Sequence, residues 1–268
     1  MVVNSQRTLY GLSIQLASLL GQEYQPLPNT TLNEKFLINP DKPIPSGVYP
    51  TINYFTIGVG GSSTIDNSGY SYSEHTAVDA ALYEHVPFVL RTLDNDLTDT
   101  ERSRYRFRKV ITVSDIDYVA YYLKVIPCII SPNSLYEVSR NNNIHKLSIL
   151  DTNTNTFLNP VPIDKELALT KYDEVGYLAK SAKLEFSLPI DELIELRNVF
   201  KILYKSEKIL TEIGVCSGMD DDNENVPEAN NVQIVYHVKV DIDTNIYINN
   251  NNDMIRAIEI GAVEPYIK

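Results

Sequence analysis

Residues 183–215 read KLEFSLPIDELIELRNVFKILYKSEKILTEIGV and contain a strand, a helix and a second strand. Apolar and polar side chains alternate over 183–188, which is typical of a strand with one buried face. The helix that follows has acidic residues near its start and lysines near its end, as the helix dipole favours. Its apolar stripe consists of Leu193, Leu196, Val199, Phe200 and Leu203. Because residues 209–215 form the next strand pattern, the segment predicts a fold of mixed strands and helices.

Strand patterns outnumber helical ones in the rest of the chain. They occur at residues 51–59, 107–113, 118–126, 146–150, 156–161 and 232–242. Helical spacing occurs at 9–21, which ends on Gly21, and at 77–90, where Pro87 interrupts it. We therefore predict an α+β fold that is mainly antiparallel β-sheet and sandwich-like, with one or two packed helices and extended terminal arms.

Composition divides the chain into three predicted ranges: 1–50, an N-terminal helix and Pro-rich arm; 51–245, a single α+β domain; and 246–268, an Asn-rich C-terminal segment. Proline is so dense in residues 22–50 that neither a helix nor a central strand is expected there. Such a segment either follows the surface of its own domain or reaches onto a neighbouring subunit. In the second case its apolar anchors at the interface would be Leu27, Leu32, Phe36 and Ile38.

The charge balance excludes several classes of partner. The 268-residue chain has a formal net charge of -12. Duplex DNA normally requires clustered lysine and arginine to release its counterions, so specific nucleic-acid binding is disfavoured. No segment has the ~18 to 20 consecutive apolar residues that cross a bilayer, so no membrane partner is expected. An acidic wall along a DNA channel is compatible with this charge, because repulsion prevents the DNA from adhering.

Motifs for catalysis, metals and cofactors are not found in the sequence. The histidines, at His75, His85, His145 and His237, lack the close spacing of metal ligands. GVGGSS at 58–63 lacks the lysine of a phosphate-binding loop, and we interpret it as a tight turn. No nucleophile elbow is present. We therefore expect a protein that is not an enzyme and has no cofactor.

Arginine recurs at every second position over a short segment, at Arg102, Arg104, Arg106 and Arg108. In a strand this spacing places guanidiniums on one face and the intervening aromatic residues on the other, whereas a helical turn would disperse them. Candidate partners within one subunit or across an interface are Asp94, Asp96, Asp99 and the acidic segment 220–228. We predict that the arginines lie at a subunit contact. The alternatives are a solvated face and a contact with DNA.

Several short stretches between Ile57 and Lys124 share one resemblance. They are IGVGGS (57–62), ALYEHVPFVLR (81–91), NDL (95–97), RYRFR (104–108) and YVAYY (118–122). Together they resemble a family of virion structural proteins from tailed bacteriophages. EIGV at 212–215 resembles a strand common in phage tail proteins. The Asn-rich composition is typical of an AT-rich genome and is similar to that of crAss-like phages, in which proteins of this kind form neck and tail rings.

The resemblance implies a structural subunit that forms a homomeric ring in the neck or tail connector, through which viral DNA passes without specific binding. The expected partners are copies of the chain and neighbouring neck and tail proteins. The expected location is the virion, after synthesis in the host cytoplasm. Two alternatives stay open: a tail-hub, baseplate or fibre-attachment protein, and a phage-encoded carbohydrate-binding or hydrolytic β-domain. The absence of tryptophan disfavours a sugar-binding platform, whereas 18 tyrosines keep it open.

Overall fold

The structure is a computed structural model that describes residues 5–39, 42–65, 69–72, 74–126, 129–130, 135–141, 144–149, 175–221 and 228–265. The chain forms two compact units. Unit 1 consists of Met1–Pro127 and Ser187–Ile255, and unit 2 of Cys128–Phe186 and Arg256–Lys268. This division differs from the predicted ranges 1–50, 51–245 and 246–268, because the strands of the middle segment pair with one another and with the C-terminal strand.

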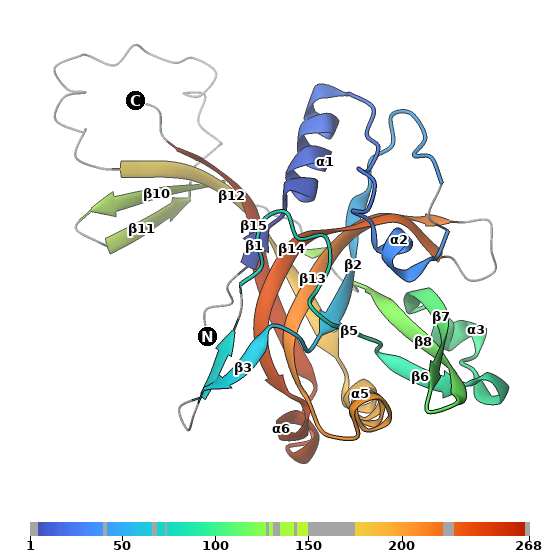
Figure 1. Cartoon of the computed structure of the whole chain (residues 1–268). Helices are drawn as coiled ribbons and strands as arrows, with labels where there is room; N and C mark the ends of the chain where they lie inside the picture. The colour runs from blue at the N-terminus through green and yellow to red at the C-terminus, as the bar shows by residue number, and fades with distance from the viewer. Residues whose placement is uncertain are drawn as a thin grey trace, which may run out of the picture. The chain divides into compact units, whose positions relative to one another are not determined.

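Unit 1 is built on a sheet whose described strands follow the order β1-β14-β13-β2-β8-β6, with β5 beside β2 and β7 beside β8 (Figure 1). Its strands are β1 Ser5–Arg7, β2 Thr51–Gly58, β5 His85–Val86, β6 Val89–Thr92, β7 Tyr105–Val113, β8 Ile116–Val125, β13 Ile209–Asp221 and β14 Glu228–Asp243. They pair antiparallel, which confirms the predicted α+β fold with mainly antiparallel sheet. A hairpin of β3 Ser62–Ile65 and β4 Gly69–Tyr72 follows β2.

The register of the central strand β13 positions the residues discussed below. β13 pairs with β14 on one side and with β2 on the other. Glu212 lies opposite Gly58 of β2, and Gly214 lies opposite His237 of β14. β7 also contacts β14, and Tyr105 and Phe107 of β7 are buried, as are most residues of β14.

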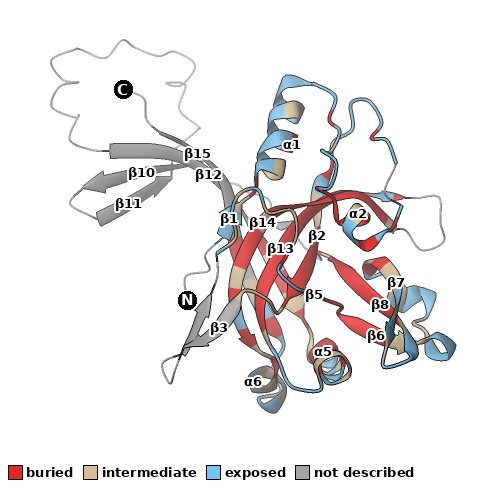
Figure 2. Ribbon diagram, viewed as in Figure 1, coloured by how far each residue is buried: buried red, intermediate tan, exposed pale blue. Residues whose placement is uncertain are grey.

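Short helices and one longer helix accompany this sheet. They are α1 Leu9–Leu20, α2 Leu32–Phe36, the 3-10 turn η1 Leu93–Asn95, α3 Asp99–Arg102, α5 Ile190–Tyr204 and α6 Thr244–Asn249. α1 and α2 contact β14, and α5 contacts β6 and α6. The predicted stripe of α5 packs inward, with Leu193, Leu196, Val199 and Phe200 buried. Figure 2 shows the buried residues concentrated in β13, β14 and β2.

The helix predicted over residues 77–90 is wrong. The end of this segment forms β5 and β6, and His85 pairs with Gly58 in the sheet. Thr76 and Asp79 form a turn at its start, where the Asp79 carboxylate accepts the Thr76 N–H at 2.8 Å. Pro87 has no N–H to donate within a helix, so sheet pairing prevails over the helical spacing.

The Pro-rich arm contains a structured element that the sequence did not indicate. Thr31 and Glu34 form a capping box that starts α2. Asn33 is buried against β14, where its side chain accepts the Val232 N–H and donates to Ala229 O, both at 2.9 Å. The asparagine side chain thus pairs with the edge of β14 in place of a neighbouring strand.

The apolar anchors of the arm are used within the same chain, which corrects the expectation that they bind a neighbouring subunit. Leu32 is completely buried, and Phe36 and Ile38 are 7% and 8% exposed. The Phe36 ring packs against the Tyr122 ring at a centroid distance of 4.5 Å. Leu27 is 66% exposed and is the predicted anchor that faces solvent.

Unit 2 contains a second antiparallel sheet with the order β11-β10-β12-β15, and β9 pairs with β12. Its strands are β9 Ile129–Ile130, β10 Leu135–Asn141, β11 Ile144–Ile149, β12 Val175–Leu188 and β15 Met254–Pro265. The predicted strand at 146–150 corresponds to β11, whose partner is β10. The strand predicted at 156–161 lies outside the described residues.

Candidate functional site

The arginine pattern is divided between a helix and a strand. α3, which begins with a capping box formed by Thr98 and Glu101, ends at Arg102, and β7 begins at Tyr105. Arg106 and Arg108 therefore alternate along β7 with the buried aromatic side chains of Tyr105 and Phe107. Only two of the four guanidiniums therefore lie on one face of a strand, as the spacing predicted for all four.

Each arginine of the pattern pairs with a carboxylate of the same chain. The pairs are Arg102–Asp99 at 3.4 Å, Arg104–Glu192 at 3.4 Å, Arg106–Asp220 at 2.7 Å and Arg108–Asp96 at 2.7 Å. The first, third and fourth of these carboxylates were predicted partners, and Glu192 was not. Because the chain supplies its own carboxylates, each arginine has a partner within the same chain, and the subunit contact stays a prediction.

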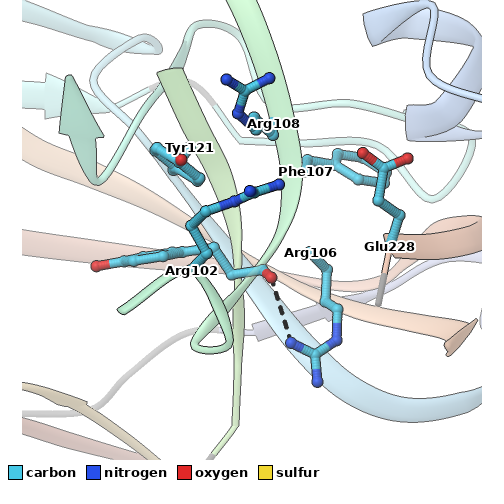
Figure 3. Close-up of a pocket in the computed structure, with 7 residues that line it drawn as sticks. Arg102, Arg106, Phe107, Arg108, Tyr121 and Glu228 are labelled. Atoms are coloured by element: carbon cyan, nitrogen blue, oxygen red, sulfur yellow. Dashed lines mark hydrogen bonds between the residues drawn. The ribbon is translucent and has the colours of Figure 1, made fainter. Parts of the chain in front are cut away.

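Three of these arginines surround a small hollow, shown in Figure 3. Its lining consists of Arg102, Tyr105, Arg106, Phe107, Arg108, Tyr121 and Glu228. The interior of about 10 Å³ holds roughly one water molecule. The partner carboxylates and Glu228 balance the guanidinium charge. The hollow therefore has neither the volume for an organic ligand nor the surplus positive charge for a phosphate.

Asp96 connects the turn after η1 to β7 and β8. Arg108 donates to Asp96 Oδ2 through Nε and Nη2, at 3.1 and 2.7 Å, and the Tyr121 hydroxyl donates to Oδ1 at 2.6 Å. Burial raises the pKa of the Asp96 carboxyl, but hydrogen bonds from Tyr121, Arg108 and the Leu97 amide outweigh it, so the pKa lies below its usual value. Burial beside this carboxylate raises the pKa of Tyr121 to about 12.

A buried ion pair joins the sheet to α5. The side chains of Lys124 in β8 and Glu192 in the first turn of α5 are 8% and 7% exposed. Lys124 Nζ binds the Glu192 carboxylate and donates to Ser187 O at 3.1 Å. Burial lowers the pKa of Lys124, and the neighbouring Glu192 opposes that shift. Because Arg104 reaches the same carboxylate, Glu192 balances two cations.

Histidines that are isolated in sequence converge near the end of β2. His75 Nε2 lies 2.7 Å from Glu212 Oε2, and His75 Nδ1 lies 3.2 Å from Asp79 Oδ2. The His75 ring stacks against Tyr83 and His237 at centroid distances of 4.3 and 3.8 Å. The His75 side chain is only 9% exposed, and the two carboxylates and the stacked rings hold it in place.

The GVGG turn provides room for this cluster. Glu212 accepts the backbone N–H of Tyr83 at 3.0 Å and that of Glu84 at 3.5 Å. A Cβ on Gly58 would lie 2.8 Å from Glu212 Oε1, and a Cβ on Gly60 would lie 2.5 Å from Tyr83 Cβ. Only glycine lets the two amides approach the carboxylate this closely. The stretches GVGG, ALYEH and EIGV are therefore parts of one packed arrangement.

His85 and His237 are buried in environments that favour the neutral ring. His85 Nε2 accepts the Leu82 N–H at 3.1 Å, and protonation would break this bond. His237 Nε2 donates to Asp79 O at 2.9 Å, and its Nδ1 has no partner within the described part of the chain. Burial lowers the pKa of His85 to about 3 and that of His237 to about 4. Both rings are therefore uncharged at neutral pH.

Within the described ranges, no group of three or more His, Cys, Asp or Glu side chains is placed to hold a metal ion. No helix in these ranges is long and apolar enough to span a membrane.

The leucines of α1 face away from the chain. The members of this leucine stripe are Leu9 at 47% exposure, Leu12 at 44%, Leu16 at 57%, Leu19 at 80% and Leu20 at 57%. The opposite side of α1 carries Ile14, which is buried, and Gly11, which contacts Val235 of β14. Figure 2 shows α1 as mostly exposed beside the buried strands. The sequence predicted this helix but not that its leucines would remain uncovered by the described residues of its own chain.

A comparison with protein families finds a family of unknown function, DUF7208, that matches residues 2–268. The chain belongs to this family. No curated protein and no solved structure matches the chain. In this DUF7208 member, residues 57–62, 81–91, 95–97, 104–108, 118–122 and 212–215 all belong to unit 1, where β2 and β13 place Gly58 opposite Glu212.

Proposed function

We propose that the chain is a structural subunit without catalytic activity that assembles with copies of itself into a ring in the neck or tail connector of a tailed bacteriophage. The observation that carries the proposal is the leucine stripe of α1. Monomeric proteins rarely leave a continuous apolar patch of this kind in water, and such patches mark surfaces that contact other molecules.

The polar clusters of unit 1 also support a structural role. The arginine pattern, the Lys124–Glu192 pair and the His75 cluster bind partners from the same chain. These contacts join strands and helices that are distant in sequence, and they are suited to hold a subunit rigid under mechanical load. A rigid sheet with one uncovered apolar helix is an appropriate building block for an assembly.

The phage setting comes from the resemblance of residues 57–124 to virion structural proteins. A closed ring forms when one surface of each copy contacts a different surface of the next copy. The net charge of -12 favours a channel wall that repels DNA and lets it slide. The expected partners are therefore copies of the chain and the adjoining neck and tail proteins.

Negative-stain electron microscopy of the purified full chain tests this function. We expect closed rings of uniform diameter with a central channel wide enough for duplex DNA. Particles of monomer size at every concentration tested, or open filaments without a channel, would contradict the ring.

A further inference from the structure

We propose that α1 is the contact between neighbouring copies, and that the leucine stripe of one copy packs against the leucine stripe of the next. This inference rests on the proposed function and adds the surface through which the copies meet. It is independent of the arginine pattern, whose carboxylate partners lie within the same chain.

The spacing of the stripe matches a helix–helix seam. Leu9, Leu12, Leu16 and Leu19 are separated by three, four and three residues, which is the a/d spacing of helices that pack side by side. Leu20 widens the stripe on one flank. A contact between the same stripe on two copies joins them in pairs, and a different surface of each pair then closes the ring. A stripe with this spacing is complementary to another copy of itself.

The helix is already formed and anchored before any partner binds. The Thr8 side chain accepts the Gly11 N–H at 3.2 Å and donates to Ile234 O of β14 at 2.7 Å. At the other end, Gly21 adopts a left-handed conformation and closes the helix. An isolated helix of this length is only marginally stable in water, but α1 is held on β14. Docking therefore requires little additional ordering of the backbone.

Two properties of the stripe favour a second copy as its occupant. The five partly exposed leucines form an apolar patch on the order of 500 Å², near the upper end for a monomeric protein. A standard interface buries about 800 Å² on each partner, so the patch is large enough for the apolar centre of one. The residues of α1, LYGLSIQLASLL, include no charged side chain. Two copies can thus meet there without repulsion between like charges.

The same lack of charge disfavours a lipid surface. Helices that lie on membranes combine an apolar face with lysine and arginine on the polar face, which bind anionic headgroups. α1 offers no cation for this purpose, and the chain as a whole is strongly acidic.

A pair of matched double variants of the full chain tests the contact. Leu12→Ser with Leu16→Ser removes the centre of the stripe, and Leu37→Ser with Leu93→Ser removes two leucines elsewhere that are 78% and 55% exposed. We expect the first variant to weaken self-association at least tenfold in sedimentation equilibrium, and the second to associate like the wild type. Thermal unfolding of the dilute monomer should change little in either variant, because each replaced side chain is at least 44% exposed.

Disulfide formation identifies what the stripe touches. Oxidation of Leu16→Cys should produce covalent dimers. Leu37→Cys should give no more covalent dimer than the wild type does. The wild type measures the background that comes from the native cysteines. Assembly of the Leu12/Leu16 variant at wild-type strength would overturn the inference and leave the proposed function standing. Loss of assembly without a Leu16→Cys disulfide would also overturn it, because the stripe would then contact another surface. A monomeric wild type would instead contradict the proposed function itself.

Discussion

Glu212 shows at the residue scale how a buried charge is accommodated in this fold. The residue is 4% exposed, and its carboxylate faces His75 Nε2 and the amides of Tyr83 and Glu84. Each donor replaces a hydrogen bond to water, so the desolvation of the carboxylate is offset. The glycine at position 58 keeps that space free of a Cβ. The carboxylate thereby joins three separate segments of the chain.

Lys124 provides a direct stability prediction at this scale. Lys124→Met leaves Glu192 buried with only the more distant Arg104 as counter-charge, and we expect a loss of about 3 to 5 kcal/mol. Adding Glu192→Gln should recover at least half of that loss, because the uncompensated charge is removed. Urea denaturation at neutral pH measures both. If the free energy of unfolding of Lys124→Met alone is within about 1 kcal/mol of the wild-type value, the Lys124–Glu192 pair does not stabilise the fold as proposed.

Two arginines of the pattern offer a matched comparison. The Arg106 side chain is 11% exposed and binds Asp220 at 2.7 Å, whereas that of Arg104 is 53% exposed and lies 3.4 Å from Glu192. We expect Arg106→Gln to lower the free energy of unfolding by about 1 to 3 kcal/mol, and Arg104→Gln by about 0 to 1 kcal/mol. Neither should change self-association. If either variant loses assembly while its monomer is as stable as the wild type, that arginine lies at a subunit contact.

The buried histidines predict loss of stability in mild acid. His237 and His85 have folded pKa values lowered to about 4 and about 3, so below the unfolded value of about 6.5 the unfolded chain binds more protons than the folded one. The free energy of unfolding should therefore fall by about 2 kcal/mol per histidine between pH 7 and pH 5. The lowered pKa of Asp96 adds its loss only below about pH 4. Urea denaturation from pH 5 to 7 measures the slope, and His237→Asn should roughly halve it. An unchanged slope would contradict the neutral assignment of His237.

At the element scale, α2 and its capping box turn a Pro-rich segment into part of the core. Asn33 satisfies the Val232 N–H, the Ala229 carbonyl and the Ile38 carbonyl, all three of which belong to buried residues. The prolines on either side restrict the unfolded chain and lower the entropy lost when the arm docks. The arm therefore belongs to unit 1 as a covering of the β14 edge.

Asn33→Ala tests this covering. We expect it to lower the free energy of unfolding by about 2 to 4 kcal/mol, since it leaves buried backbone groups without partners. The control is Asn198→Ala on the exposed side of α5, which should stay within about 0.5 kcal/mol of the wild type. If the two variants unfold alike, the arm does not contribute to the stability of unit 1.

Elements with strong local signals were predictable, and elements set by distant contacts were not. α5 and the two strands of the β7–β8 hairpin follow from the spacing of their own apolar residues. Residues 77–90 have equally good helical spacing, but His85 pairs with Gly58 and the segment joins the sheet. The arginine partners Asp96, Asp99 and Asp220 were foreseeable from charge, whereas the His75–Glu212 contact depends on strand register that no local spacing reveals. The exposed direction of the α1 leucines likewise depends on which face of the helix meets β14.

At the scale of the whole molecule, apolar attraction and charge repulsion oppose each other. The leucine stripe favours association, while a formal net charge of -12 on each copy disfavours it. The balance depends on ionic strength, because salt screens the repulsion and leaves the apolar contact intact.

This opposition predicts the salt dependence of assembly. Raising the ionic strength from about 0.01 M to about 0.15 M shortens the Debye length from ~30 Å to ~8 Å, so self-association should become tighter. Contacts made by arginine–carboxylate pairs across an interface would instead weaken with salt. Sedimentation equilibrium at the two salt concentrations measures the dissociation constant. Weaker association at the higher salt would argue against the leucine stripe and for an ionic interface.

The central claim is that the chain assembles with copies of itself, and its most direct test is the mass of the full chain in solution. Sedimentation velocity over a wide range of protein concentration, at physiological salt, should show the 30.3 kDa monomer giving way to one discrete larger species that contains several copies. A sedimentation profile that stays monomeric up to the solubility limit would contradict the account.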